Sequence, residues 1–112
     1  MPQAISNTSP LFYLHRIHVL DWLPRLFDEI WTPKAVILEL QEGSRRGFDV
    51  PHTDDYSWLK VVNPHYIPSE WFALDLGAGE LAAMSLALEH PERLILLDDG
   101  LAKADFGSAV CD

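Results

Sequence analysis

The sequence predicts an α/β fold with a parallel sheet, and three features of its pattern lead to that fold class. Short β-prone segments alternate with segments of helical periodicity along the chain. The run Leu94–Leu97 is apolar throughout, as is typical of a strand buried on both faces of a parallel sheet. Two adjacent carboxylates, Asp98 and Asp99, follow it directly. In folds of this class the crossovers are right-handed, and ligands collect at the carboxyl ends of the strands.

The first part of the chain predicts a strand, two helices and a second strand. Residues 3–6 form the first strand, and Ser9 caps a helix in which Pro10 takes the first helical position. A second, short helix is expected over residues 19–27, followed by a strand at residues 29–31.

The middle of the chain repeats this pattern once more. Thr32 and Pro33 form a second capping pair, and they open a helix whose apolar stripe consists of Val36, Ile37 and Leu40. The segment 43–47 ends that helix and carries the only clustered basic residues. A third strand is expected over residues 58–62, after a polar loop.

The last part predicts one long helix, the final strand and one more helix. The segment Gly77–Glu80 starts the long helix, which runs to about Glu89 and is apolar on most of its circumference, so we expect it to be buried on more than one side. Leu94–Leu97 is the final strand, and a helix over residues 101–110 follows.

Length and composition limit the class of protein. The 112 residues suit one domain with its own core, so we expect a single domain over residues 1–112. No apolar run reaches the roughly 20 residues of a membrane helix. The N-terminus lacks the basic start of a secretory signal, so a cytoplasmic location is expected. The one cysteine excludes an internal disulfide, and no Cys/His spacing is that of a zinc site.

The net charge of −9 leaves two interpretations open. A nucleic-acid-binding protein is expected to carry a basic patch, which argues against that class. An acidic balance fits a protein that gathers carboxylates around Mg²⁺ or Mn²⁺, because these cations prefer oxygen ligands. It also fits simple solubility.

Oxygen-bearing side chains occur at four places where a parallel sheet could bring them together: Asn7, Glu39, Glu80, and the pair Asp98 and Asp99. If the first and last strands are neighbours, Asn7 and the two aspartates flank a topological switch point. Glu80 begins a helix, whose dipole keeps it ionised as a metal ligand requires. Taken alone, Glu80 is equally a helix cap, Glu39 a solvated residue, and the aspartates a turn.

The order and context of these positions resemble the PIN-domain family. The similar segments are Asn-Thr-Ser-Pro-Leu from residue 7, Thr-Pro-Lys-Ala-Val-Ile-Leu-Glu from residue 32, Gly-Ala-Gly-Glu-Leu-Ala-Ala-Met-Ser-Leu-Ala from residue 77, and Leu-Ile-Leu-Leu-Asp-Asp from residue 94. The resemblance covers residues 5–106. It is strongest to small prokaryotic predicted nucleic-acid-binding proteins related to VapC-type toxin nucleases.

This resemblance implies a three-layer α/β/α domain and a Mg²⁺- or Mn²⁺-dependent endoribonuclease of the toxin type. The catalytic residues that it implies are Glu39, Glu80, Asp99 and Asp98. The implied metal ligands are Asn7, Glu39, Glu80, Asp98 and Asp99. The implied nucleic-acid contacts are Thr8, Ser9, Arg45 and Arg46, although the two arginines are equally a solvated loop. RNA and an antitoxin protein are the implied partners, and a membrane is not.

Two departures from the family pattern leave alternatives open. The family's first acidic residue is Asn7 here, which keeps an oxygen without the charge and weakens metal binding. The family's last strand has no counterpart before Asp112, so Leu94–Leu97 is expected at an edge of the sheet, where a longer natural chain or a second copy covers it. We therefore expect a homo-oligomer.

These departures favour the alternative function, a non-catalytic PIN-like module that binds a protein or itself. A nucleotide-binding protein is a distant third, since Gly77–Gly79 before Glu80 matches neither phosphate-binding glycine pattern.

Overall fold

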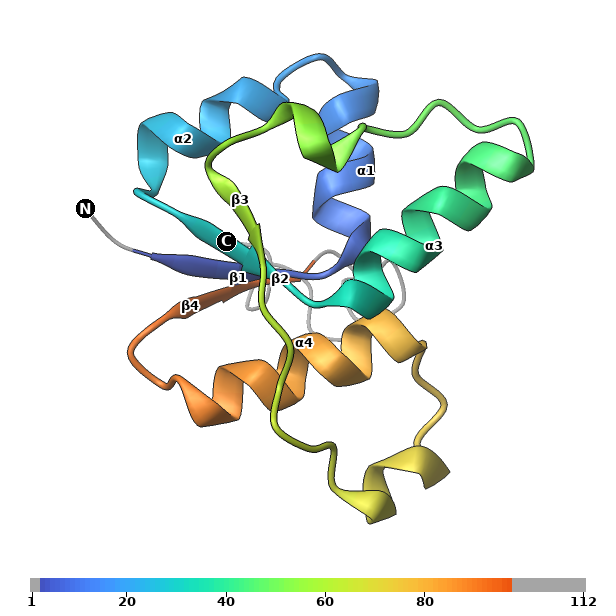
Figure 1. Cartoon of the computed structure of the whole chain (residues 1–112), viewed down its shortest axis with the longest axis vertical. Helices are drawn as coiled ribbons and strands as arrows, with labels where there is room; N and C mark the ends of the chain where they lie inside the picture. The colour runs from blue at the N-terminus through green and yellow to red at the C-terminus, as the bar shows by residue number, and fades with distance from the viewer. Residues whose placement is uncertain (1–2, 98–112) are drawn as a thin grey trace.

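The computed structural model describes residues 3–97. Its centre is a four-stranded parallel sheet with the strand order β3-β2-β1-β4 (Figure 1). The strands are β1 (Ala4–Ser6), β2 (Ile30–Thr32), β3 (Leu59–Val61) and β4 (Leu94–Leu96). The predicted α/β class is confirmed, and the first and last strands are neighbours, the condition for a switch point between Asn7 and the aspartates, with Ile5 opposite Ile95.

The helices connect these strands in the expected order. The chain passes from β1 through α1 (Thr8–Arg16) and α2 (Leu23–Leu26) to β2, and α3 (Lys34–Arg45) follows. After β3, α4 (Ala78–Glu89) leads to β4. Short 3₁₀ turns occupy Leu20–Trp22, Thr53–Asp55 and Ser69–Ala73. None of the helices within residues 3–97 has the length and apolar character needed to cross a membrane.

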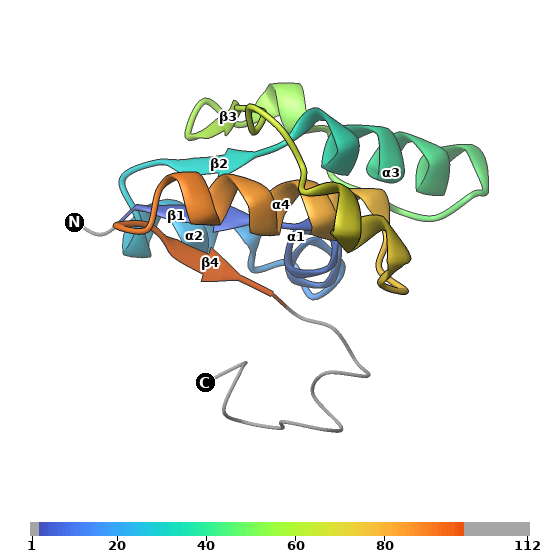
Figure 2. The same cartoon turned by 90° about the horizontal axis from the view of Figure 1, so that it is seen from below.

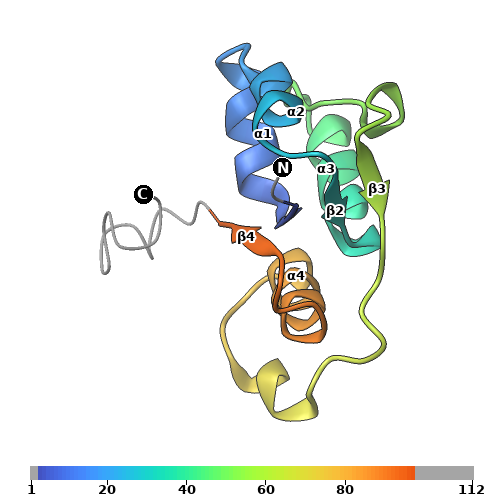
Figure 3. The same ribbon diagram turned by 90° about the vertical axis from the view of Figure 1, so that its left-hand side faces the viewer.

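Different helices cover the two faces of the sheet. On one face, Ala4 of β1 lies in a core with Leu11 of α1 and Leu23 of α2. On the other face, Ile5 packs in a second core with Leu86 of α4. Alternate residues of a strand point to opposite faces, so neighbouring residues of β1 serve different cores. Figures 2 and 3 show the result, with α4 on the side of the sheet opposite α1 and α2.

Strand β4 lies at an edge of the described sheet, as expected, but the two-sided burial predicted for it is wrong. Leu94 is 54% exposed, and the two residues after it are half-buried. Within residues 3–97, β4 pairs with β1 alone. An apolar run implies burial on both faces when the strand is central, whereas β4 lies at an edge of the described sheet and leaves Leu94 exposed.

The start of α1 differs from the prediction. The helix begins at Thr8, with Asn7 at the cap position, and Ser9 and Pro10 lie within its first turn. The Asn7 side chain makes no capping hydrogen bond. Ser9 is therefore not the cap, and Asn7 comes two residues closer to the helix than expected.

The start of α3 is capped from another part of the chain. Thr32 ends β2 rather than capping the helix, and its hydroxyl donates to the Ser6 carbonyl at 2.9 Å. The first N–H of α3, that of Lys34, donates to Asn63 Oδ1 at 2.8 Å. Asn63 follows β3, so this cap joins two crossovers.

The other element predictions fall close to the structure. The helix expected over residues 19–27 is a 3₁₀ turn followed by α2, and α3 continues through Gly43 and ends at Arg45. The helix expected over residues 101–110 lies outside the described residues.

Arg93 closes the amino-terminal end of the sheet, directly before β4. Its side chain is 4% exposed, and its guanidinium carbon lies 3.3 Å from the centroid of the Trp31 ring. Nη1 donates to the Ala4 carbonyl at 3.3 Å, and Nη2 lies 3.7 Å from a carboxylate oxygen of Glu29. Burial lowers the pKa of Arg93, and the charges of Glu29 and Glu92 oppose that change. Arginine stays protonated regardless, so this is a buried cation.

Candidate acidic site

Three helices and two strands meet at the carboxyl end of the sheet (Figure 1). The backbone N–H of Asn7, after β1, lies 3.4 Å from the carbonyl oxygen of Leu96, which ends β4. The first turns of α1 and α4 both contact one side chain of α3, that of Glu39. This place is the topological switch point that the sequence predicts.

Glu39 is half-buried and bonded to two other helices. The Thr8 hydroxyl donates a short hydrogen bond to Oε1, and the backbone N–H of Gly79 donates to Oε2 at 2.9 Å. An ionised carboxylate has about four lone-pair sites. Two of them therefore remain available for a cation or a further donor.

The carboxylate of Glu39 occupies space beside α4 that a side chain at Gly79 would fill. A Cβ atom at Gly79 would lie 2.9 Å from Glu39 Cδ and 3.0 Å from Thr8 Oγ1. At Gly77 it would lie 3.3 Å from Glu39 Oε2. Glu80 follows Gly79 in the same helical turn and is half-buried. Glycine at position 79 thus permits the close approach of α3 to α4.

Asn7 presents a buried oxygen to this region. The residue is 5% exposed, and within the described structure its Oδ1 has no hydrogen-bond partner. A buried acceptor without a donor costs roughly 1–3 kcal/mol. A hard cation or a water molecule would remove that cost, and amide oxygens are ligands that Mg²⁺ and Ca²⁺ accept.

Some of the residues predicted for a metal site lie within the described structure. Asn7, Glu39 and Glu80 lie on the elements that meet here, and their oxygen atoms suit Mg²⁺ or Mn²⁺. Asp98 and Asp99 lie outside the described residues, although β4 ends beside Asn7 just before them. Within residues 3–97, no group of three or more His, Cys, Asp or Glu side chains could hold a metal ion. A complete acidic site therefore requires at least one of the two aspartates.

The predicted nucleic-acid contacts divide into two groups. Thr8 is bonded to Glu39, and Ser9 follows it in the first turn of α1. Arg45 and Arg46 are exposed at the end of α3, and both pair with Glu42, at 2.6 and 3.3 Å. Arg45 lies about 9 Å beyond Glu39 along the helix axis. Arg45 and Arg46 therefore lie away from the hydrogen bonds that Glu39 makes with Thr8 and Gly79.

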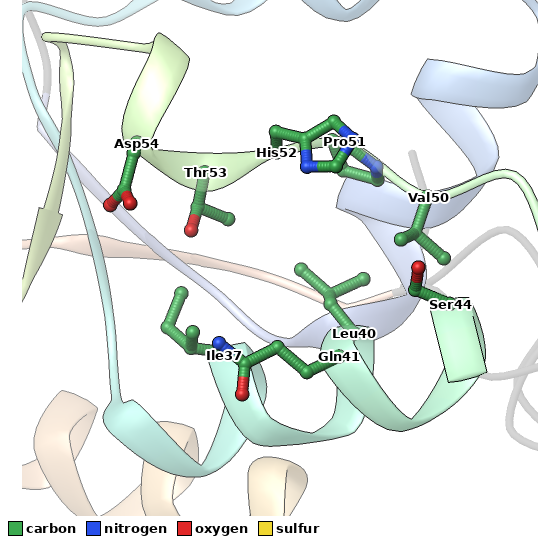
Figure 4. A pocket seen from close by; sticks show the side chains of 9 residues that line it. All are labelled: Ile37, Leu40, Gln41, Ser44, Val50, Pro51, His52, Thr53 and Asp54. Carbon is green, nitrogen blue, oxygen red and sulfur yellow. The ribbon is translucent and has the colours of Figure 1, made fainter.

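A pocket of about 230 Å³ lies on another side of α3 (Figure 4). Side chains of α3 line one wall and residues 50–54 the other, and none of the candidate acids borders it. The lining residues are Ile37, Leu40, Gln41, Ser44, Val50, Pro51, His52, Thr53 and Asp54.

Sequence reasoning missed the role of Gly79. The segment Gly77-Ala78-Gly79 was compared with phosphate-binding loops, which it does not match. A glycine inside the first turn of a helix also indicates close approach of another group, and that signal was present. It could not reveal which group approaches, because Glu39 is distant in sequence.

Comparison with known proteins gives one match. A family model described as a PIN domain matches residues 3–105, a range that includes every candidate acid and both aspartates. No curated protein and no solved structure matches the chain.

Proposed function

The chain belongs to the PIN-domain family, which has a nuclease-type fold, and on this basis we propose that it is a metal-dependent endoribonuclease of the toxin-like type. The observation that carries the proposal is the meeting of α1, α3 and α4 around Glu39, beside the buried and unpartnered oxygen of Asn7. This arrangement lies at the carboxyl end of a parallel sheet, where α/β proteins bind their ligands.

The proposed ligands of Mg²⁺ or Mn²⁺ are Glu39, Glu80 and either Asp99 or Asp98, with Asn7 as a weaker, uncharged ligand. A bound divalent cation polarises a phosphate group and lowers the pKa of a coordinated water. The proposed ligand residues hold the cation and thereby orient the phosphate group and the water. The Thr8 hydroxyl and the Gly79 N–H support this proposal, because they fix one carboxylate without consuming all of its lone pairs.

RNA is the proposed substrate, with Ser9, Arg45 and Arg46 as contacts to its phosphates. The exposure of both arginines supports this role, while their pairing with Glu42 means that RNA must compete with an acid for them. An antitoxin protein and a second copy of the chain are proposed partners. The exposed Leu94 at the sheet edge is compatible with either. We also propose that residues 1–112 form one domain and that the protein is cytoplasmic.

The second candidate is a non-catalytic PIN-like module that binds a protein partner or itself. The observation in its favour is Asn7, because the amide lacks the charge that an acidic residue would bring to the cation. The experiments below distinguish the two functions.

The first experiment measures Mn²⁺ binding by calorimetry and cleavage of a generic RNA with Mn²⁺, with and without a chelator. The nuclease proposal expects binding at or below millimolar Mn²⁺ and cleavage that the chelator abolishes. Glu80→Gln should lose both, whereas Glu70→Gln, an exposed glutamate of the 3₁₀ turn Ser69–Ala73, should lose neither. Binding without cleavage would favour the non-catalytic module, and the absence of both would reject the nuclease.

The second experiment restores the missing charge with Asn7→Asp. We expect Mn²⁺ affinity to rise at least tenfold, the scale at which groups around a metal site act. The metal-free variant should unfold at a lower temperature, because a buried carboxylate gains no donor there. Mn²⁺ at about 100 times its Kd should then stabilise it by about 2.7 kcal/mol. An unchanged affinity would show that Asn7 does not face the acids.

A further inference from the structure

The structure points to a role for Gly79 that neither its sequence context nor its family assigns. We propose that Gly79 is a positioning residue, whose N–H and whose lack of a side chain hold the Glu39 carboxylate in place for its cation. The inference rests on the proposed metal-dependent function.

The first argument is the direction of the hydrogen bonds. Glu39 reaches from α3 to the N-terminus of α4, where the Gly79 N–H points at its Oε2. The N–H groups of a first helical turn have no partner within their own helix, and their dipole favours a negative charge. Gly77, at the cap position of α4, has no side chain to cap the helix, and Glu39 of α3 supplies an acceptor for a first-turn N–H beside Glu80 of α4 itself.

The second argument is steric. Alanine at position 79 would put a methyl group against the Glu39 carboxylate, 2.9 Å from its Cδ and 3.0 Å from Thr8 Oγ1. The nearest atoms in its way belong to the end of the flexible Glu39 side chain, which can move without moving a backbone, and Thr8 Oγ1 is the next nearest. The variant should therefore fold and displace Glu39 from its two donors.

The third argument concerns Thr8, which the family resemblance implies is a nucleic-acid contact. Its hydroxyl is bonded to Glu39 Oε1, the oxygen that Gly79 does not bond. The two donors come from different helices and together fix both oxygens of one carboxylate. Thr8 is accordingly a second positioning residue for Glu39.

The test compares Gly79→Ala with Gly77→Ala by Mn²⁺ titration and by thermal unfolding. For Gly79→Ala we expect at least tenfold weaker Mn²⁺ binding. The unfolding temperature should stay within a few degrees of the wild type, since alanine is the better helix former. Gly77→Ala, whose Cβ would lie 3.3 Å from Glu39 Oε2, should weaken binding less. Equal Mn²⁺ affinity of Gly79→Ala and the wild type would overturn the proposal.

Two variants at Thr8 keep the test valid if Gly79→Ala fails to fold, and a double variant extends the test if Gly79→Ala folds. Thr8→Val removes the hydroxyl at nearly constant volume and should weaken Mn²⁺ binding, and Thr8→Ser should restore it. In the Gly79→Ala protein, Glu39→Asp withdraws the carboxylate by one methylene and should cost less affinity than in the wild type. Failure of Thr8→Ser to restore binding, or additive effects in the double variant, would contradict the positioning role.

A measurement without metal separates this inference from the proposed function. In the metal-free protein, the Gly79 amide proton should resonate downfield and move upfield in Glu39→Gln, where a charged acceptor becomes neutral. If the wild type binds no Mn²⁺ and cleaves no RNA, the nuclease proposal fails while this shift still reports the Glu39 contact. An unmoved Gly79 resonance would overturn the positioning inference whatever the activity.

Discussion

Replacing Arg93 by methionine should destabilise the protein without affecting the acidic site. The cation–π contact with Trp31, in a desolvated position, contributes about 2 kcal/mol. The hydrogen bond to the Ala4 carbonyl, at 3.3 Å, contributes about 1 kcal/mol more. The Glu29 carboxylate lies 3.7 Å away and is partly exposed, so solvent screening makes its share small.

Methionine recovers part of this loss, because its apolar side chain buries well and the Arg93 Nε, a buried donor without a partner in the described structure, disappears. The net loss is about 2–3 kcal/mol. For a domain of this size, each kcal/mol of lost stability lowers the unfolding temperature by about 4 °C, so we expect a decrease of about 8–12 °C. Arg93→Lys keeps the charge but not the flat contact with Trp31, so its decrease should be intermediate.

Calorimetry of the metal-free protein measures this effect, with Arg25→Met, an exposed arginine of α2, as the matched control. Mn²⁺ affinity should stay within twofold in Arg93→Met, because Arg93 and Asn7 lie at opposite ends of the parallel strands β4 and β1. An unfolding temperature within 2 °C of the wild type would refute the assignment of a stabilising role to the buried cation.

Two other expectations concern the polar links between crossovers. Asn63→Ala removes the acceptor for the first N–H of α3 and should cost about 1 kcal/mol of stability, whereas Asn63→Asp should retain the cap. Urea unfolding of both variants measures the difference, and an equal loss of stability in the two would exclude capping. Burial raises the pKa of Glu89, but its hydrogen bonds from His65 prevail and hold it below the ordinary 4.5. A carboxylate whose pKa is lowered by folding contributes stability above pH 4.5, and this contribution is lost as the pH falls through the folded pKa. Glu89→Gln should therefore flatten the dependence of unfolding free energy on pH in that acidic range. An unaltered pH dependence would contradict the link between Glu89 and His65.

The sheet could be predicted from the sequence because its signals are local. Each strand is a short β-prone run between breaks, and the parallel class follows from alternation with helices. That β1 and β4 are neighbours was the condition for a switch point between Asn7 and the aspartates, and the structure meets it. The burial of Leu94 could not be predicted locally, since the exposure of an edge strand depends on what covers it.

The helix ends were less predictable, because they also depend on residues that are distant in sequence. Ser9 and Thr32 stand before a proline as cap residues do, yet Thr32 donates to Ser6 and Asn63 caps α3 from after another strand. At α3 a tertiary partner replaces the local one, whereas α1 begins at Thr8 with no side-chain capping bond.

The sequence led to the candidate residues of the site, whose role stays a prediction, but not to their contacts. Asn7, Glu39 and Glu80 could be named from their places before or within helices, and their elements do meet. That both oxygens of Glu39 are bonded by Thr8 and Gly79 requires the packing of α3 against α4, which no short-range pattern encodes.

The contrast between Glu39 and Asn7 bears on how such a site changes during evolution. Glu39 joins α3 to α1 and α4, so selection for a stable fold alone would preserve it in a relative without nuclease activity. The Asn7 side chain makes no capping bond, and its Oδ1 has no partner in the described structure, so no described hydrogen bond of that oxygen selects for asparagine at this position. In related sequences, an acid at position 7 would therefore be a better marker of retained chemistry than the glutamate at position 39.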